Sequence, residues 1–229
     1  MGAVAVASIN EPEDAPMRHA TIPSLVATAV ACFAVQAQAA DQMRSVAPFT
    51  AISNSGPLSL RIEVGKTQSV TVGGDEDLVP ELETEVVDNE LRLHLRHEMH
   101  HFDGHHGGLH VTVTLPQLTA FTMNGAGNTT ITNMSGDHLD INFVGAGGLK
   151  AEGTVKTLKL DVSGAASIDT RALHADTADI NLAGVGSVKV WAGQSLDASV
   201  GGVGSLRYYG DPKTVNTHGG GLGSVSKGK

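Results

Sequence analysis

A short glycine-containing marker recurs six times in the second half of the chain, and its spacing restricts the fold more than any other feature. The marker is Gly-x-Gly or a close variant, and its first glycines lie 20, 19, 20, 18 and 19 residues apart. The six copies are Gly125-Ala126-Gly127, Gly145-Ala146-Gly147, Gly164-Ala165-Ala166, Gly184-Val185-Gly186, Gly202-Val203-Gly204 and Gly221-Leu222-Gly223. A fixed period of about 19 residues is typical of a fold that stacks one small unit on the next.

The residues around each marker alternate between apolar and polar. In five of the six copies apolar residues stand four and two positions before the marker, as Phe121 and Met123 do in the first copy, and a polar residue stands between them. The fourth residue after the first glycine is apolar in five of the six copies. A period of two indicates a β-strand with one buried face. Each repeat is therefore predicted to be a strand, a glycine corner, a second strand and a turn.

One such unit cannot bury its own apolar face, but units stacked about 4.8 Å apart pair every strand with its equivalent and enclose a narrow core. We therefore predict an all-β fold, a right-handed parallel β-helix or solenoid with about 19 residues per turn over residues 121–229. Glycine is expected at the corners because a Cβ would clash there or because φ must be positive. The residue between the glycines grows from Ala126 to Leu222 along the chain, and we expect these residues to form a stacked apolar column in a core that widens toward the C-terminus.

Residues 46–120 precede the repeats and show looser strand patterning. Leu58, Leu60, Ile62 and Val64 alternate strictly with polar residues. Solenoids need atypical terminal turns, because a regular open end would pair with other chains. We interpret residues 46–120 as an irregular N-terminal capping region with a His-rich loop at 94–110, and residues 121–229 as the repeat solenoid.

The composition and charge agree with this interpretation and exclude some functions. The 28 glycines and the aromatic content of 3% suit many short strands joined by tight turns. The formal net charge of −9 argues against non-specific binding of nucleic acid, which needs Lys and Arg to neutralise phosphates. A basic patch for a membrane surface is also missing from the sequence.

The N-terminal residues predict export. Met17-Arg18-His19 begins a short positive region, an apolar stretch follows, and Ala37-Gln38-Ala39 has the small-x-small pattern of a signal-peptidase site. We interpret residues 1–16, which are acidic, as lying upstream of the true start, and residues 17–39 as a signal peptide cleaved near Ala39. Lipidation at Cys32 is the alternative. The mature chain is expected to have no transmembrane segment and to reach the periplasm, the outer cell envelope or the medium.

Several segments together resemble a known family. They are Phe49-Thr50-Ala51-Ile52, the run from Leu58 to Val64, Asn89-Glu90-Leu91, Leu115-Pro116-Gln117-Leu118, and the closing segment from Gly202 to Pro212. In this order, ahead of and within the glycine repeats, they resemble the head GIN domain family, which is described as auto-transporter adhesins. The resemblance covers nearly all of the mature chain. It implies an exported or envelope β-helical fold and no catalytic residues.

Seven of the eleven histidines fall between His94 and His110. Residues 97–101 match the letters of the H-E-x-x-H zinc-protease motif, but that motif needs a helix to bring its two histidines together. The flanking residues alternate as strands, where residues four apart lie about 13 Å from each other. A second hypothesis is a metal site in which the loop wraps around Zn²⁺, Ni²⁺ or Cu²⁺. The alternative is a solvated loop without a specific role. The candidate metal ligands are His97, His100, His101, His105 and His106.

Two weaker constellations lie in the repeats. Asp140, Asp179 and Asp197 recur at one position of the repeat, but Lys159 interrupts them, so we predict a solvated face with alternating charge and not a catalytic carboxylate ladder. Trp191, Tyr208 and Tyr209 stand on neighbouring turns, and an aromatic platform for a sugar or peptide and simple packing at the turn both remain open.

The sequence thus predicts a non-enzymatic, exported β-solenoid that acts as a binding or adhesion-type scaffold of the cell envelope or surface. No catalytic residue and no cofactor are predicted, apart from Zn, Ni or Cu at the His-rich loop. The ligand is unknown, and a cell-surface glycan or protein is the candidate partner. The alternative function is a divalent transition-metal-binding protein that uses the His-rich loop.

Overall fold

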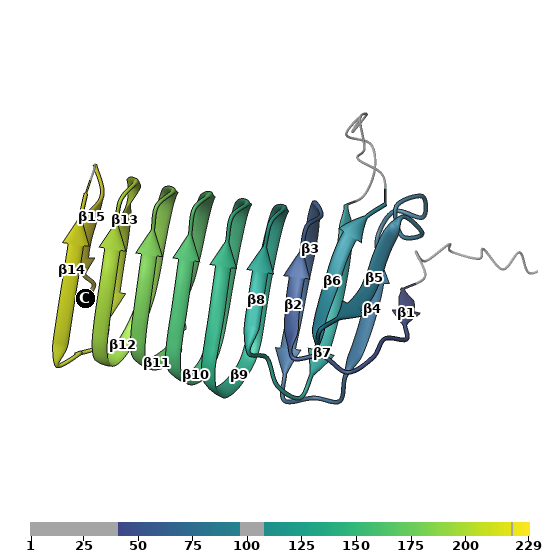
Figure 1. Cartoon of the computed structure of the whole chain (residues 1–229), viewed down its shortest axis with the longest axis horizontal. Helices are drawn as coiled ribbons and strands as arrows, with labels where there is room; N and C mark the ends of the chain where they lie inside the picture. The colour runs from purple at the N-terminus through teal and green to yellow at the C-terminus, as the bar shows by residue number, and fades with distance from the viewer. Residues whose placement is uncertain (1–40, 97–107, 221) are drawn as a thin grey trace, which may run out of the picture. The chain divides into compact units, whose positions relative to one another are not determined.

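The computed structural model describes residues 41–96, 108–220 and 222–229, and these ranges contain fifteen strands and no helix (Figure 1). The described part of the chain therefore offers no helical span for a membrane. The all-β prediction is confirmed. The signal peptide and most of the His-rich loop lie outside the described residues.

Eight short strands precede the repeats. They are β1 (Gln42–Arg44), β2 (Ala51–Asn54), β3 (Leu58–Val64), β4 (Ser69–Gly73), β5 (Leu82–Val87), β6 (Glu90–Leu95), β7 (Leu109–Leu115) and β8 (Ala120–Met123). Antiparallel pairing is confined to this part of the described chain, where it joins β1 to β4, β4 to β7 and β5 to β6. In contrast, β2 and β3 pair in parallel with later strands.

The repeats form the remaining seven strands. They are β9 (Ala126–Phe143), β10 (Ala146–Val162), β11 (Ala165–Leu182), β12 (Val185–Val200), β13 (Val203–Tyr209), β14 (Thr214–Gly219) and β15 (Ser224–Lys227). The strands β9 to β12 are long because each one runs through a whole turn of the solenoid, here called a rung. All pairing between successive rungs is parallel.

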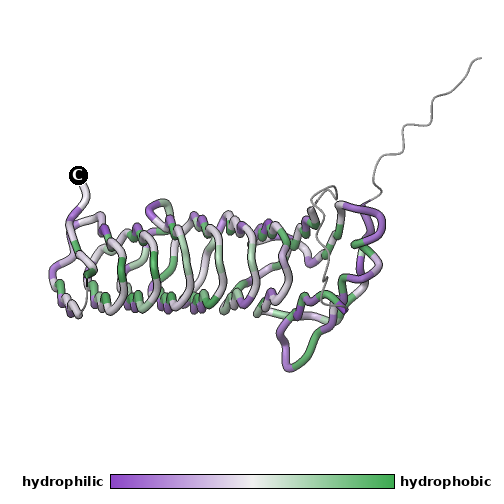
Figure 2. Tube along the Cα trace, turned by 90° about the horizontal axis from the view of Figure 1, so that it is seen from above, coloured by the Kyte–Doolittle hydropathy of each residue, from purple (hydrophilic) through white to green (hydrophobic). Residues whose placement is uncertain are grey.

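The register between rungs confirms the sequence repeat. Ala126, Ala146, Ala165, Val185 and Val203 occupy one column of paired residues. Neighbours in this column are 20, 19, 20 and 18 residues apart in the chain, which matches the spacing of the markers. Figure 2 shows the chain coiling through these turns, with hydrophobic residues recurring on each one. The protein is a parallel β-solenoid with rungs of about 19 residues.

Each rung has two sides, so the stacked rungs form two sheets. Sheet I contains β1, β4, β7 and β3, the first half of each strand from β9 to β12, and then β13 and β15. Sheet II contains β5, β6, β2 and β8, the second half of each strand from β9 to β12, and then β14. One corner between the sheets is the glycine marker, and the other corner follows the first half of each rung.

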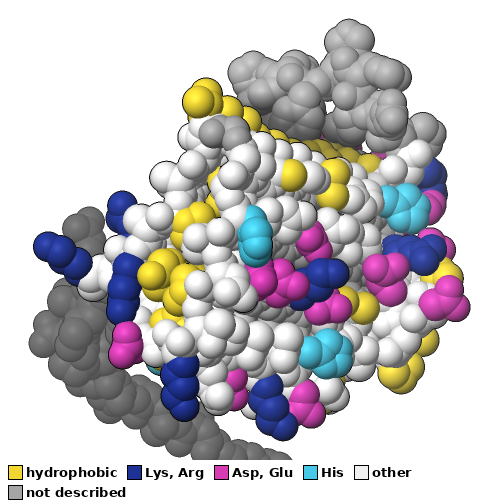
Figure 3. Space-filling view, turned by 60° about the vertical axis from the view of Figure 1, so that its left-hand side comes forward, with side chains coloured by type: hydrophobic (Ala, Val, Ile, Leu, Met, Phe, Trp, Pro, Cys, Tyr) yellow, Lys and Arg dark blue, Asp and Glu magenta, His cyan; other side chains and the backbone are white. Residues whose placement is uncertain are grey.

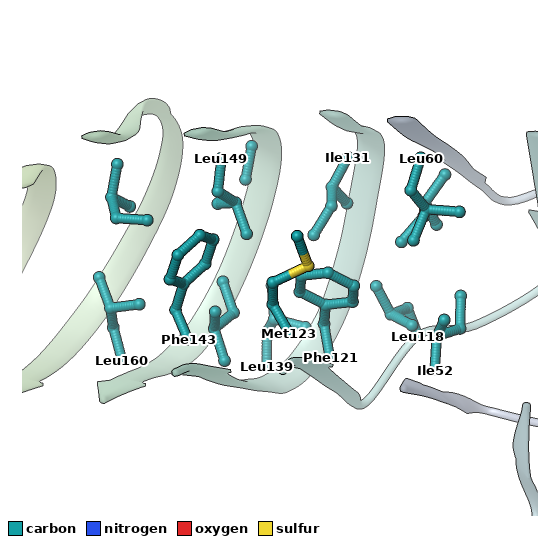
Figure 4. Packing of buried hydrophobic residues seen from close by; sticks show 14 of the residues in the cluster. Ile52, Leu60, Leu118, Phe121, Met123, Ile131, Leu139, Phe143, Leu149 and Leu160 are labelled. Carbon is teal, nitrogen blue, oxygen red and sulfur yellow. The ribbon is translucent and has the colours of Figure 1, made fainter. Parts of the chain in front are cut away.

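The core lies between the two sheets. Leu60, Ile131 and Leu149 extend into it from sheet I and face Phe121 and Phe143 from sheet II (Figure 4). All five side chains are buried. Since every rung contributes equivalent inward residues, the core is a continuous row along the repeats and not one central cluster.

The glycine corners exist because successive backbones approach each other closely there. A Cβ added to Gly164 would stand 1.8 Å from the carbonyl oxygen of Gly145, and a Cβ added to Gly145 would stand 1.8 Å from the carbonyl oxygen of Gly125. Real Cβ atoms do not approach a backbone atom so closely. The first glycine of the marker is therefore required by the stacking of the rungs themselves.

The middle residue of each marker corrects one prediction. The residues do form a stacked column, but the column points outward: Val185 is 58% exposed, Val203 is 54% exposed and Leu222 is 84% exposed. The alternation of inward and outward residues continues unbroken through the corner, from Met123 past the marker to Thr129, and this places the middle residue on the outer side. The increase in size from Ala to Leu therefore does not widen the core.

Candidate functional site

The outer face of sheet I carries two parallel columns of polar side chains on the repeats. The first, called the hydroxyl column, consists of Asn128, Gly148, Ser167, Ser187, Ser205 and Ser224. The second, called the cationic column, consists of Arg61, Thr130, Lys150, Asp169, Lys189 and Arg207. Each member of the second column follows the first by two residues on its rung, so both columns face the same side of the sheet. They run side by side along the stacking direction of the rungs.

The cationic column has unneutralised positive charge. Lys150, Lys189 and Arg207 form no ion pair with any residue in the described ranges. Its one acidic member, Asp169, is paired with Arg171, whose Nε and Nη2 donate hydrogen bonds of 2.9 and 2.6 Å to the two carboxylate oxygens. These hydrogen bonds hold the pKa of Asp169 below its ordinary value and raise the pKa of Arg171. Asp169 is therefore charged, but Arg171 cancels its charge.

Two hollows flank the cationic column, and both share Thr130, Lys150 and Asp169 as lining residues. One hollow, of about 490 Å³, extends toward the hydroxyl column and is lined there by Asn128, Gly148 and Ser167. The side chain of Asn128 lies over Gly148, where a Cβ would stand only 2.7 Å from Oδ1 of Asn128. The other hollow, of about 450 Å³, extends toward the second corner and reaches Glu152 and Arg171.

Aromatic side chains form a column at the second corner. His174, Trp191 and Tyr209 pair in register on three successive rungs. The rings of His174 and Trp191 are stacked, with centroids 4.4 Å apart and planes inclined by 23°. The guanidinium of Arg171 lies 5.7 Å from the centre of the Tyr209 ring, a cation–π distance. Arg171 thus joins the aromatic column to the cationic column.

The aromatic column also lines a third hollow. This hollow, of about 450 Å³, lies between the His174–Trp191 stack and the Lys156–Asp137 ion pair, in which Nζ is 2.6 Å from the carboxylate. The sequence left a platform and packing in the core or at the turn open for Trp191, Tyr208 and Tyr209. Tyr208 is partly buried and packs against the core. In the structure Trp191 and Tyr209 are half-buried at the corner, and Trp191 lines this hollow.

The outer face of sheet II is acidic. Asp140, Lys159, Asp179 and Asp197 form one column, as predicted, and Asp161 stands beside it. Lys159 lies 3.6 Å from Asp161 and His218 lies 3.7 Å from Asp197, so the face carries two separate, solvated pairs. On the side of the molecule in Figure 3, acidic side chains lie beside basic ones, with exposed hydrophobic atoms between them. The surplus of positive charge is a property of sheet I.

The histidines that the sequence singled out lie mostly outside the described residues. This holds for His97, His100, His101, His105 and His106, so their metal binding stays a prediction. The two flanking histidines are described: Nε2 of His94 lies 2.8 Å from a carboxylate oxygen of Glu83, and Nε2 of His110 lies 3.4 Å from Asp41. The described ranges contain no group of three or more His, Cys, Asp or Glu that could hold a metal ion.

The sequence contains a signal for the cationic column, although this column was not among those predicted from it. Lys150, Asp169, Lys189 and Arg207 each stand five residues after the first glycine of their marker. In a solenoid, residues at a constant offset from the corner lie in one column. Charged residues at this constant offset predict a charged column. The alternation of inward and outward residues along the strand places this column on the outer face.

Comparisons with known proteins agree with the fold. A solved structure described as a "putative adhesin" from Bacteroides fragilis is 24% identical, covers 82% of this chain and 96% of its own, and has a TM-score of 0.64. Another "putative adhesin", from Parabacteroides merdae, is 16% identical, covers 83% and 96%, and has a TM-score of 0.50. At these identities the likeness shows the fold alone. The search of curated proteins gave no match.

The sequence itself matches one family model. The match covers residues 48–212, which include the strands from β2 to β13 and all but the last of the six markers. The resemblance found in the sequence is thereby confirmed. The chain belongs to the family described as "Putative auto-transporter adhesin, head GIN domain".

Proposed function

We propose that this protein is an exported, non-enzymatic adhesion module of the cell envelope or surface, which binds its ligand on the outer face of sheet I. The observation that carries the proposal is the pair of hollows along the cationic column, because concave surfaces with convergent polar groups are where proteins bind ligands. The family description as an adhesin supports the same class of function.

The chemistry of the face favours binding over catalysis. Acid–base or nucleophilic catalysis needs a reactive group held beside a partner that activates it. The serines of the hydroxyl column have only Gly or Ser as their column neighbours, and Asp169 is engaged with Arg171. A regular array of hydroxyls and cations suits a ligand with repeating groups.

Retention on surfaces tests the adhesion function. Labelled protein is applied to bacterial and host cells and to arrays of neutral and acidic glycans, with a denatured sample as the control. We expect retention that saturates and that excess unlabelled protein displaces. A protein that is retained on none of these surfaces would leave only a structural role.

Export is the part of the proposal that rests on residues 17–39. Signal-peptidase cleavage after Ala39 leaves Ala40 as the first residue, whereas lipidation would leave a modified Cys32. Mass spectrometry of the N-terminus of the protein from an envelope fraction distinguishes the two. An unprocessed N-terminus in that fraction would contradict both forms of export.

The alternative function, metal binding by the His-rich loop, is tested separately. Clustered imidazoles are good ligands for Zn²⁺, Ni²⁺ and Cu²⁺. Calorimetric titration of each ion compares the protein with a variant in which His97, His100, His101, His105 and His106 are replaced by Asn. The alternative requires tighter binding by the unmodified protein, and equal affinities would eliminate it.

A further inference from the structure

We propose that the ligand of sheet I is a linear acidic polysaccharide, whose carboxylate or sulfate groups pair with Lys150, Lys189 and Arg207. This inference rests on the proposed function and deepens it by naming the class of ligand. Its basis is the juxtaposition of unpaired cations and a hydroxyl-lined hollow on one face, with an aromatic column at the adjoining corner.

The first step concerns charge. The protein has a formal net charge of −9, and two neighbouring outward columns of sheet II on the repeats carry Asp140, Asp161, Asp179 and Asp197 against the single lysine Lys159. An anion is therefore repelled by most of the molecule and attracted by the cationic column. Such a local patch of one sign orients a charged partner during encounter. The positive charge on sheet I thus selects both the sign of the ligand and the face on which it binds.

The second step concerns spacing. Lys150 and Lys189 are two rungs apart, which is about 10 Å, and Arg207 follows one rung further, at about 5 Å. The three cations thus lie in a straight line along the stacking direction. A linear polymer with a regularly recurring acidic group can reach all three without bending, whereas a compact anion can reach only one or two.

The third step distinguishes a polysaccharide from other polyanions. Asn128, Thr130 and Ser167 line the hollow beside Lys150 and offer donors and acceptors to sugar hydroxyls. Trp191 and Tyr209 follow Lys189 and Arg207 by two residues on their rungs, and half-buried aromatic rings present apolar surface to the C–H groups of a sugar ring. Even with Arg61 included, the unpaired cations of this column are too few to hold nucleic acid on so acidic a protein.

Direct binding to a panel of immobilised polysaccharides tests the proposal with the intact protein. The acidic probes are polygalacturonate, alginate, hyaluronan and chondroitin sulfate, and the neutral probes are methyl-esterified polygalacturonate and dextran. Vesicles with an anionic phospholipid provide a different class of polyanion. We expect saturable binding to at least one acidic polysaccharide, none to its neutral counterpart, and an affinity that falls as salt rises.

Two variants with the same change in net charge locate the site. The first carries Lys150→Gln, Lys189→Gln and Arg207→Gln on the cationic column. The control carries Lys66→Gln, Lys159→Gln and Lys213→Gln, which are exposed and lie off this column. Exposed ion pairs contribute modestly, so loss of three is expected to weaken binding about tenfold in the first variant, with little change in the control. Circular dichroism checks that both variants fold.

The outcomes separate this inference from the function on which it rests. Three results would overturn the proposal that the ligand is an acidic polysaccharide. They are equal binding to the neutral and acidic forms, equal weakening of binding in both variants, and binding to anionic vesicles alone. Each of them would still leave a protein that binds surfaces. Absence of binding to every probe and to the cell surfaces would overturn both proposals.

Discussion

At the scale of single residues, the solenoid depends on positions that have no room for a side chain. A Cβ added to the first glycine of the second, third, fourth or fifth marker would stand 1.8 to 2.0 Å from the carbonyl oxygen of the first glycine one rung earlier. This contact explains why glycine persists at that position while the middle residue of the marker varies from Ala to Leu. Close stacking of the backbone, and not the demands of a turn alone, selects the glycine.

The substitution Gly164→Ala tests this explanation. The new Cβ would stand 1.8 Å from the carbonyl oxygen of Gly145, so the rungs must move apart, and we expect a loss of about 1–3 kcal/mol in the free energy of unfolding. The control is Gly136→Ala, where the nearest atoms lie 3.4 and 3.9 Å away. Denaturant unfolding measures both. Equal stability of the two variants would show that the glycine column is not required for stacking.

Two buried threonines provide a second test. The hydroxyl of Thr129 has no hydrogen-bond partner among the described residues, and this position is Leu149 or Ile168 in the next rungs. The hydroxyl of Thr170 donates a hydrogen bond of 3.0 Å to the backbone carbonyl of Lys189. Thr129→Val should therefore stabilise the protein by about 1 kcal/mol, because it removes an unsatisfied polar group.

The isosteric change Thr170→Val is the matched control for Thr129→Val. It removes a hydrogen bond that is made, so we expect no gain and a loss of up to about 1 kcal/mol. Thermal or denaturant unfolding of the two variants gives the comparison. A destabilised Thr129→Val protein would mean that the Thr129 hydroxyl has a partner in solution.

At the scale of elements, the period of the sequence is sufficient to predict most of the fold. Strand, corner and strand recur at a constant interval, and the alternation from Met123 to Thr129 passes through the glycine corner without a break. The alternation of inward and outward residues therefore places the middle residue of the marker on the outer side. The prediction that this residue lies in the core was wrong because it relied on the apolar character of Val185 and Leu222 and not on the period of two along the strand.

The second corner could not be predicted in the same way. The backbone takes positive φ at Asn133 (56°) and Gly153 (133°), and the pairing of β10 with β11 and of β11 with β12 shifts register near this corner. Such irregularities change which side a residue faces. The sequence therefore placed Trp191 and Tyr209 on neighbouring rungs but could not show that Trp191 stacks on His174.

Equivalence of the rungs predicts that one rung can be removed whole. Deletion of residues 146–164 joins Gly145 to Ala165, which then takes the place of Ala146 opposite Ala126. The shortened chain should fold with a strand-type circular dichroism spectrum and unfold cooperatively, with a free energy of unfolding lower by about 1–3 kcal/mol. Deletion of residues 146–154 removes only part of a rung and is the control, which should not fold. Aggregation of both proteins would contradict equivalence.

At the scale of the whole molecule, the two sheets carry different charged columns on their outer faces. Sheet I exposes the cationic column and its hollows, and sheet II exposes the acidic column. The core between them is uniform along the repeats, so the rungs can vary their outward residues without disturbing it. The difference between the faces is therefore set by surface residues at fixed offsets from the glycine marker.

The parallel stacking of the rungs also determines how the molecule responds to force. The hydrogen bonds between rungs point along the stacking direction, and β1 and β15 lie at opposite ends of the strand order. A load applied between the ends therefore pulls on one rung interface at a time, and the rungs should detach in sequence at low force.

Each rung of about 19 residues would release about 60 Å of chain. Single-molecule pulling would record a sawtooth with this step, and one large step would mean that the rungs yield together. A solenoid built in this way would lengthen under tension while the rungs that have not yet been released stay folded.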